Sequence, residues 1–126
     1  MKYKGTLAVV RDCNKAFEFY HNMFGLELIT DNGGNMELSG NIYLQEKGYW
    51  ETFTNKAVIS KNNCSELYFE ESDIEGFVKK LEKLYPETEY VNKVTTHSWG
   101  QTVVRFYDPD GNLIEVGTPP EDKESF

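Results

Sequence analysis

The 126-residue sequence has few cysteines and no long apolar run. Its two cysteines, Cys13 and Cys64, stand in no metal-ligand spacing, which argues against a cysteine-based metal site. No segment approaches the ~20 apolar residues that span a bilayer. Residues 1–4 lead into a short strand without a signal-cleavage pattern. We therefore expect a cytoplasmic protein whose cysteines are reduced.

Positive charge is also scarce. The chain has 13 Lys and Arg against 21 Asp and Glu, which gives a formal net charge of −8 at pH 7. Proteins that bind nucleic acids or anionic membranes use clustered Lys and Arg to neutralise phosphate groups. The composition therefore argues against nucleic acid and against a membrane as the main partner.

Aromatic residues, by contrast, are abundant. The chain has eight Phe, eight Tyr and two Trp, and 39% of its residues are hydrophobic. A chain of this length buries roughly two thirds of the surface that it exposes when extended, which suffices for a core without disulfides or metal ions. We therefore predict one domain over residues 1–126.

The spacing of hydrophobic residues changes from a strand-like to a helix-like repeat at two places along the chain, in the same order each time. This repetition predicts two copies of one structural unit. In the first copy, a strand at 5–11 precedes a helix that Asp12 caps and Gly25 ends. Three short strands then follow, separated by glycine turns, at 26–31, 35–39 and 41–47. The first copy thus has the order βαβββ over residues 5–47.

The second copy follows a connector, residues 48–63, that has no clear period. It spans residues 64–118 and begins with a strand at 65–71. A helix runs from an S-x-x-E capping box at 72–75 to Pro86, and the turn DPDG precedes the last strand. The three further strands are predicted at 89–95, 101–107 and 112–117, and residues 119–126 are predicted to form a loose tail. The fold class is therefore α+β, with two βαβββ repeats.

Several motifs on these elements resemble one protein family. They are Phe19-Tyr20, residues 24–26 (FGL), residues 99–101 (WGQ) and residues 105–116 (RFYDPDGNLIEV). Together with the double repeat, they resemble the vicinal oxygen chelate superfamily, also called the glyoxalase/bleomycin-resistance/dioxygenase superfamily. The resemblance covers about residues 3–118. It implies two curled sheets that form a half-barrel cleft, a metal ion or small organic ligand inside it, and assembly as a homodimer.

The resemblance also implies where a metal ion would bind. Family metal sites take one ligand from the first strand and one from the last strand of each unit. When the helix caps and last turns of the two units are matched, these positions are Gly5, Leu44, Glu66 and Glu115. Because only the two glutamates can bind a cation, we predict that the chain has no complete metal site. A divalent metal held by Glu66 and Glu115 is the alternative.

Strand alternation provides a second prediction about the cleft. In strand 101–107, Val104 and Phe106 are the natural helix-facing pair, and the apolar residues of strand 65–71 alternate in the same way. The residues that alternate with them are therefore predicted to face the cleft. They are Glu66, Tyr68 and Glu70 in strand 65–71, and Val103, Arg105 and Tyr107 in strand 101–107.

Arg105 is then expected close to Glu66 and Glu115. Its guanidinium group can bridge two carboxylates by forked hydrogen bonds. Two interpretations remain open: Arg105 anchors an anionic or carbonyl-bearing ligand, or it belongs to a salt-bridge network that stabilises the unit. Trp99 is a candidate stacking surface for a planar ligand, although buried packing or a dimer interface is the more frequent use of such an aromatic residue.

Two functions are compatible with these features. The first is a small-molecule binding protein without a complete metal site, with Tyr68, Trp99, Arg105 and Tyr107 as ligand-binding residues. The second is an enzyme, namely a lyase, isomerase or dioxygenase of the glyoxalase type. Such an enzyme would depend on a metal ion or use Glu66 or Glu115 as a general base, since paired carboxylates in a partly apolar site can have one raised pKa.

Overall fold

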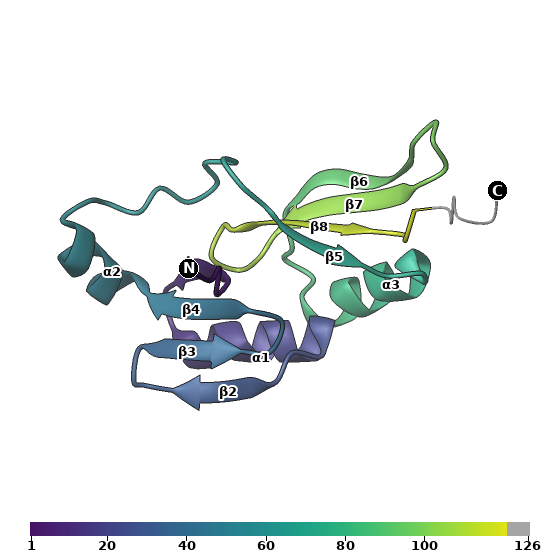
Figure 1. Cartoon of the computed structure of the whole chain (residues 1–126). Coiled ribbons are helices and arrows are strands. Elements are labelled where there is room, and N and C mark those ends of the chain that lie inside the picture. The colour runs from purple at the N-terminus through teal and green to yellow at the C-terminus, as the bar shows by residue number, and fades with distance from the viewer. Residues whose placement is uncertain (121–126) are drawn as a thin grey trace. The chain divides into compact units, whose positions relative to one another are not determined.

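The structure is a computed structural model that describes residues 1–120 of the chain. The chain divides into two compact units, residues 1–60 and a second unit that begins at Lys61. Each unit contains one four-stranded sheet (Figure 1). Among the described residues, no helix is long and apolar enough to cross a membrane. Most of the predicted loose tail, from residue 121 on, lies outside the described residues.

The first unit confirms the predicted order βαβββ. Its sheet has the strand order β1-β4-β3-β2, with β1 parallel to β4 and the other neighbours antiparallel. The elements are β1 (Thr6–Val10), α1 (Cys13–Phe24), β2 (Leu28–Asp31), β3 (Asn35–Leu38) and β4 (Ile42–Glu46).

The ends of α1 are those predicted from the sequence. The Asp12 side chain accepts hydrogen bonds from the backbone N–H groups of Asn14 and Lys15 at 2.9 and 3.1 Å. Gly25 ends the helix with a φ of 68°, in the left-handed region that glycine adopts without a steric cost. These two residues fix the position of α1 in the chain, so that its apolar side packs on β3 and β4.

The segment predicted as a connector without secondary structure contains a further helix, α2 (Lys47–Thr54). The prediction for this segment was wrong because α2 lacks the signals that sequence patterns detect. Glu46 at its N-cap makes no side-chain capping hydrogen bond, and none of the helix residues is buried. Without a buried face the helix has no apolar stripe to recognise.

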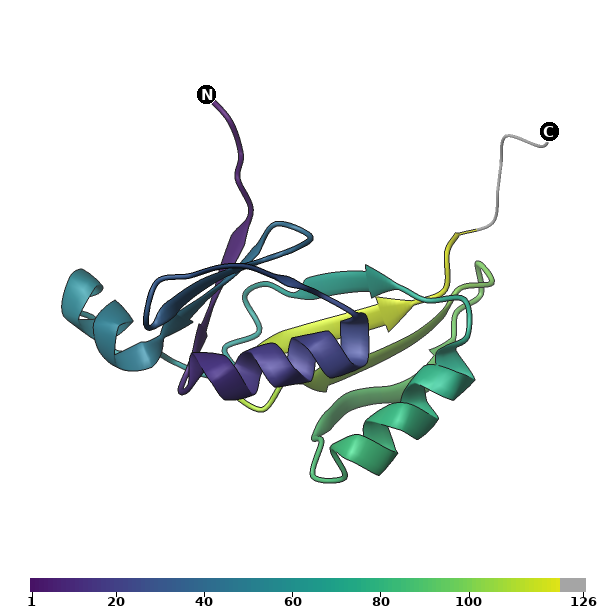
Figure 2. The ribbon, with the colours of Figure 1, turned by 90° about the horizontal axis from the view of Figure 1, so that it is seen from below.

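The second unit repeats the order and topology of the first. Its strand order is β5-β8-β7-β6, with β5 parallel to β8 and the other neighbours antiparallel. The elements are β5 (Leu67–Glu70), α3 (Ile74–Leu84), β6 (Tyr90–Thr96), β7 (Thr102–Tyr107) and β8 (Leu113–Gly117). Figure 2 shows α3 beside the strands of this unit.

Asp73, and not Ser72, caps α3. The Asp73 side chain accepts a hydrogen bond from the backbone N–H of Gly76 at 2.9 Å. Both residue types are good N-caps, and the cap stands one residue later than the S-x-x-E pattern suggests. Glu75 is therefore in the second helical position, too early to close a capping box.

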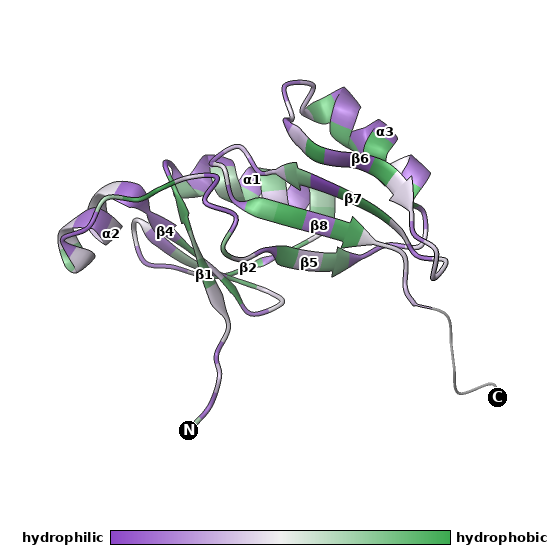
Figure 3. Cartoon of the chain, turned by 90° about the horizontal axis from the view of Figure 1, so that it is seen from above, coloured by the Kyte–Doolittle hydropathy of each residue, from purple (hydrophilic) through white to green (hydrophobic). Residues whose placement is uncertain are grey.

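The core of the second unit lies between α3 and one face of its sheet. The four central sheet residues Val104, Phe106, Ile114 and Val116 are at most 1% exposed. The Phe106 ring lies 6.0 Å from that of Phe77 on α3. Figure 3 accordingly colours most of β8 as hydrophobic. This arrangement confirms the predicted strand register and directs Val103, Arg105 and Tyr107 to the opposite face.

The predicted hairpin turn joins β7 to β8. The Asp108 carboxylate is 4% exposed and accepts hydrogen bonds from the backbone N–H groups of Asp110 and Asn112 at 2.9 and 2.8 Å. It also accepts one from Asn112 Nδ2 at 2.9 Å, and Gly111 N–H donates to the Asp108 carbonyl at 3.0 Å. One buried carboxylate thus holds the whole turn and fixes the pairing of the two strands.

Candidate functional site

Arg105 lies between two carboxylates on the face of the second sheet that is turned away from α3. Its Nη2 atom is 2.6 Å from Glu115 Oε1, and its Nε atom is 3.7 Å from Glu66 Oε1. Arg105 and Glu115 are directly paired across β7 and β8. The expectation that strand alternation brings these three residues together is therefore confirmed.

The three side chains differ in how firmly they are held. Glu115 is on β8, a central strand, and is only 8% exposed. Arg105 is also held from the other side, where its Nη1 donates to Asn92 Oδ1 on β6 at 3.3 Å. Glu66 precedes β5, and its side chain is 34% exposed. Glu66 is therefore the member of this cluster that is best placed to meet a ligand.

The electrostatics single out the same residue. Partial burial raises the pKa of Glu66 above its usual value, and the neighbouring Glu115 raises it further by its charge and a shared hydrogen bond. Arg105 opposes this shift, but it does not cancel it. Glu66 therefore holds a proton more readily than an isolated glutamate.

A second group of side chains extends from this cluster along the same sheet. Tyr68 is the β5 partner of Glu115, and its hydroxyl accepts a hydrogen bond from Gln101 Nε2 at 2.9 Å. Gln101 Nε2 also donates to the Thr118 carbonyl at 2.9 Å, and Gln101 Oε1 accepts from Trp99 Nε1 at 3.2 Å. Gln101 thus links the position of Tyr68 to that of Trp99.

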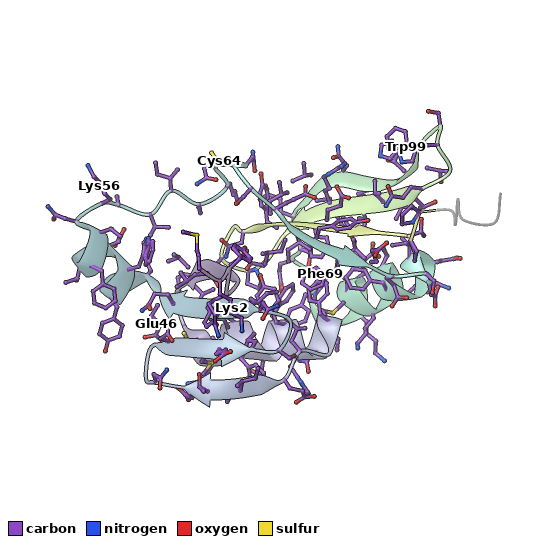
Figure 4. The ribbon with its side chains drawn as sticks, in the orientation of Figure 1. Lys2, Glu46, Lys56, Cys64, Phe69 and Trp99 are labelled. Carbon is purple, nitrogen blue, oxygen red and sulfur yellow. The ribbon has the colours of Figure 1, made fainter. Side chains whose placement is uncertain are left out.

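Trp99 lies in the hairpin between β6 and β7, where Figure 4 labels it. It is 64% exposed, and its ring is stacked on that of His97 with centroids 4.2 Å apart and an interplanar angle of 12°. His97 therefore supports the indole ring from one side, and a large part of Trp99 faces outward. This geometry is compatible with a planar ligand or with a protein surface.

Tyr107 is on the same face of β7 as Arg105 but is engaged in a separate contact. Its hydroxyl donates to Asn63 Oδ1 at 2.7 Å. The Lys61 ammonium lies 5.5 Å from the centre of its ring, within the range of a cation–π interaction. The structure thus shows Tyr107 joining β7 to the segment that precedes β5.

Two residues that support the site, Asn92 and Thr118, were not predicted from the sequence. Asn92 lies on β6, whose pairing with β7 is interrupted by two register shifts, so its position opposite Arg105 does not follow from alternation. The contact of Thr118 is made by its backbone carbonyl, which no residue-type pattern can reveal. Gln101 was visible in the sequence only as part of the WGQ motif.

A family model, described as a glyoxalase-like domain, matches residues 3–121 of the chain. The chain belongs to the glyoxalase-like family. The resemblance inferred from the WGQ and DPDGN motifs is thereby confirmed. A search among curated proteins finds no match to the sequence of this glyoxalase-like domain.

Solved structures support the same fold. A protein of unknown function from Agrobacterium tumefaciens is 29% identical, with a TM-score of 0.77 and 94% of each chain covered. A glyoxalase/bleomycin resistance protein/dioxygenase family enzyme from Burkholderia phytofirmans is 13% identical, with a TM-score of 0.76 and coverage of 91% of this chain and 96% of that one. A lactoylglutathione lyase from Agrobacterium tumefaciens is 21% identical, with a TM-score of 0.70 and coverage of 93% and 92%.

The structure corrects one of the four positions at which the family would place metal ligands. Leu44 is 0% exposed, on the buried face of β4, whereas Glu115 is on the face of β8 opposite to the buried Ile114 and Val116. Tyr43, which alternates with Leu44, is therefore the first-unit counterpart of Glu115. The reason is turn length, since three residues separate β3 from β4 but five separate β7 from β8.

Gly5 keeps the position that corresponds to Glu66, but its backbone leaves no room for a side chain. Its φ is 145°, and a Cβ atom there would overlap the backbone carbonyl of Asn41. The first-strand position of this unit is thus restricted to glycine.

The residues of the glyoxalase-like domain therefore do not fit the metal site that the family implies. Of its four positions, only Glu66 and Glu115 carry carboxylates, and the Arg105 guanidinium already lies against both of them. Within residues 1–120, no three His, Cys, Asp or Glu side chains are grouped closely enough to hold one ion. Catalytic zinc or iron sites usually have three protein ligands, more than the two carboxylates that these positions supply.

Proposed function

We propose that this glyoxalase-like protein binds a small, neutral organic ligand on the Arg105 face of its second sheet without a bound metal ion. The observation that carries the proposal is the position of Arg105 between Glu66 and Glu115. In this arrangement Arg105 donates to a carbonyl oxygen of the ligand, and Glu66 meets a hydrogen-bond donor beside it.

The charges of the cluster favour a neutral ligand over an anionic one. Two ionised carboxylates and one guanidinium leave a net charge of −1, and a proton on Glu66 brings it to zero. In neither state does the cluster have the positive charge that attracts an anion. The guanidinium has five N–H groups, more than its three contacts require, so it retains the capacity to donate to a carbonyl group.

The aromatic residues supply the complementary part of the proposed site. Tyr68 is 46% exposed beside Glu115, and Trp99 is 64% exposed. Gln101 holds the Tyr68 hydroxyl and the Trp99 indole N–H by hydrogen bonds, which limits the freedom of both side chains. A ligand with a planar ring beside its carbonyl group matches this order of polar and aromatic residues.

An enzymatic function is the second candidate, and the Glu66 pKa favours it. A raised pKa suits a general base near neutral pH, and Arg105 is close enough to polarise a carbonyl group next to the proton that Glu66 would remove. Glu115 would then act as the buried partner that holds Arg105. A lyase or isomerase reaction of this kind needs no metal ion.

Ligand-observed NMR with a panel of neutral aromatic amides and ketones tests the proposal. The corresponding aromatic carboxylates serve as matched anions. We expect the neutral compounds to bind the wild type and to lose binding in Arg105→Ala. Lys79→Ala, which removes an exposed lysine of α3, is the control and should bind as the wild type does. Equal binding by Arg105→Ala, or stronger binding of the carboxylates, would contradict the proposal.

A further inference from the structure

Glu66 and Glu115 supply two carboxylates of the kind that bind a cation, and a side chain of the same protein, Arg105, lies against both. We propose that the Arg105 guanidinium is the resident cation of this pair, and that its removal opens a site for a divalent cation that prefers oxygen ligands. The inference concerns the chain's own residues and does not depend on the proposed organic ligand.

The geometry of the three side chains supports this role for Arg105. Its Nη2 and Nε atoms each face one carboxylate, at 2.6 Å from Glu115 and 3.7 Å from Glu66. A guanidinium group presents its N–H donors in a plane, so it can neutralise two carboxylates at once. Any metal ion at this position would have to displace a charged side chain that Asn92 also holds.

The two carboxylates depend on one guanidinium group for a positive partner. Arg105 lies against both of them, and the three residues of this cluster include no other cation. Without the guanidinium the two carboxylates would repel each other with no positive charge between them. A divalent cation near neutral pH would supply the missing charge.

Carboxylate oxygens are the ligands that Mn²⁺ and Mg²⁺ prefer. Glu115 is buried on a central strand, so its oxygen positions are fixed by the sheet. Glu66 is more exposed and can complete the coordination together with water. Such a site would bind the cation weakly, and it would be present only in variants that lack Arg105.

Isothermal titration calorimetry with MnCl₂ at pH 7.5 tests the inference on the full chain. We expect Arg105→Ala to gain about one Mn²⁺ site per chain, with an affinity at least tenfold above that of the wild type. The double variant Arg105→Ala/Glu115→Gln should lose this gain. Arg105→Lys, which keeps a cation in place, should behave as the wild type does, and Lys79→Ala controls for the loss of a surface charge.

Two results would overturn the inference. One is a wild type that already binds Mn²⁺ in a manner that Glu115→Gln abolishes, since Arg105 would then yield to the metal. The other is a folded Arg105→Ala, as judged by circular dichroism, that gains no affinity over the wild type. If Arg105→Ala does not fold, Arg105→Gln is judged by the same two criteria.

Discussion

Arg105 and Glu115 stand directly opposite each other on β7 and β8, with Nη2 and Oε1 2.6 Å apart. The Glu115 side chain is 11% exposed, while the arginine side chain is 30% exposed. The pair therefore joins a buried charge to a partly accessible one. A change at Arg105 should affect stability and the proposed ligand binding together, because both depend on the same guanidinium.

Replacing Arg105 by alanine is expected to lower the free energy of unfolding at pH 7 by about 1–3 kcal/mol. This is less than the 3–5 kcal/mol for a fully buried pair because Arg105 is partly exposed. The loss should shrink at pH 5, where one of the two unpaired carboxyl groups takes a proton. Urea unfolding at both pH values measures it, and a small difference that does not depend on pH would contradict the stabilising role of Arg105.

Glu66→Gln is expected to stabilise the protein near neutral pH relative to the wild type. The pKa of Glu66 is raised in the folded state above its usual 4.5, so the folded state binds this proton more tightly than the unfolded state. The resulting stabilisation is present below pH 4.5 and is lost as the pH rises through the higher folded value. Glutamine mimics the protonated form at every pH.

Thermal unfolding of wild type and Glu66→Gln between pH 4 and pH 8 checks this sign. The two curves should approach each other in acid and separate near neutrality, with the variant higher. Glu70→Gln, an exposed carboxylate at the end of β5, is the matched control. A variant that is less stable than the wild type at pH 7 would mean that the attraction to Arg105 outweighs burial and the repulsion by Glu115.

Gly5→Ala is expected to destabilise the chain by about 2–4 kcal/mol, from the strain of a positive φ and the overlap with the Asn41 carbonyl. Gly48→Ala in α2 is the matched control. A Cβ atom at Gly48 meets nothing within 4 Å, so alanine should be neutral or stabilise by about 0.5 kcal/mol. Urea unfolding of both variants distinguishes the two cases, and equal effects would refute the assigned backbone conformation of Gly5.

Trp99→Ala is expected to leave stability within about 0.5 kcal/mol of the wild type, because the residue is 64% exposed. Its affinity for neutral aromatic amides should fall by about two- to tenfold, the range for one aromatic contact. Phe53→Ala, at an equally exposed aromatic position of α2, should not change the affinity. If both variants bind normally, Trp99 belongs to another surface and not to the ligand site.

We also expect a homodimer, since closed two-fold dimers are the commonest oligomers and β2 is an edge strand whose four residues are all exposed. Light scattering coupled to size-exclusion chromatography should give twice the chain mass of 14.6 kDa. A mass of one chain across a range of concentrations would refute this expectation.

The sequence was sufficient to predict the parts of the fold that depend on strong local signals. Asp12 and Asp108 accept hydrogen bonds from backbone N–H groups two to four residues further along the chain, and Gly25 adopts a left-handed backbone conformation, so their positions follow from residue type. The direction of Arg105, away from α3, followed from the apolar pair Val104 and Phe106, because alternation along a strand is strict.

The remainder depended on contacts that the sequence does not record. Helix α2 has no buried residue, so it leaves no apolar period. The equivalence of Glu115 with Tyr43 depends on how many residues each hairpin turn contains. Both turns contain a glycine-asparagine pair, and matching these pairs aligned Glu115 with Leu44, one residue away from Tyr43. The contact between Arg105 and Asn92 depends on irregular pairing between β6 and β7.

The buried carboxylate of Asp108 affects more of the sheet than the turn that it holds. By holding the turn between β7 and β8, it decides which residue of one strand faces which residue of the other. A slip by a single position would exchange the two faces of a strand, so that Arg105 would point toward α3 and Val104 toward the opposite face. The chemical character of the Arg105 face is therefore determined at the turn, by a residue outside the Glu66–Arg105–Glu115 cluster.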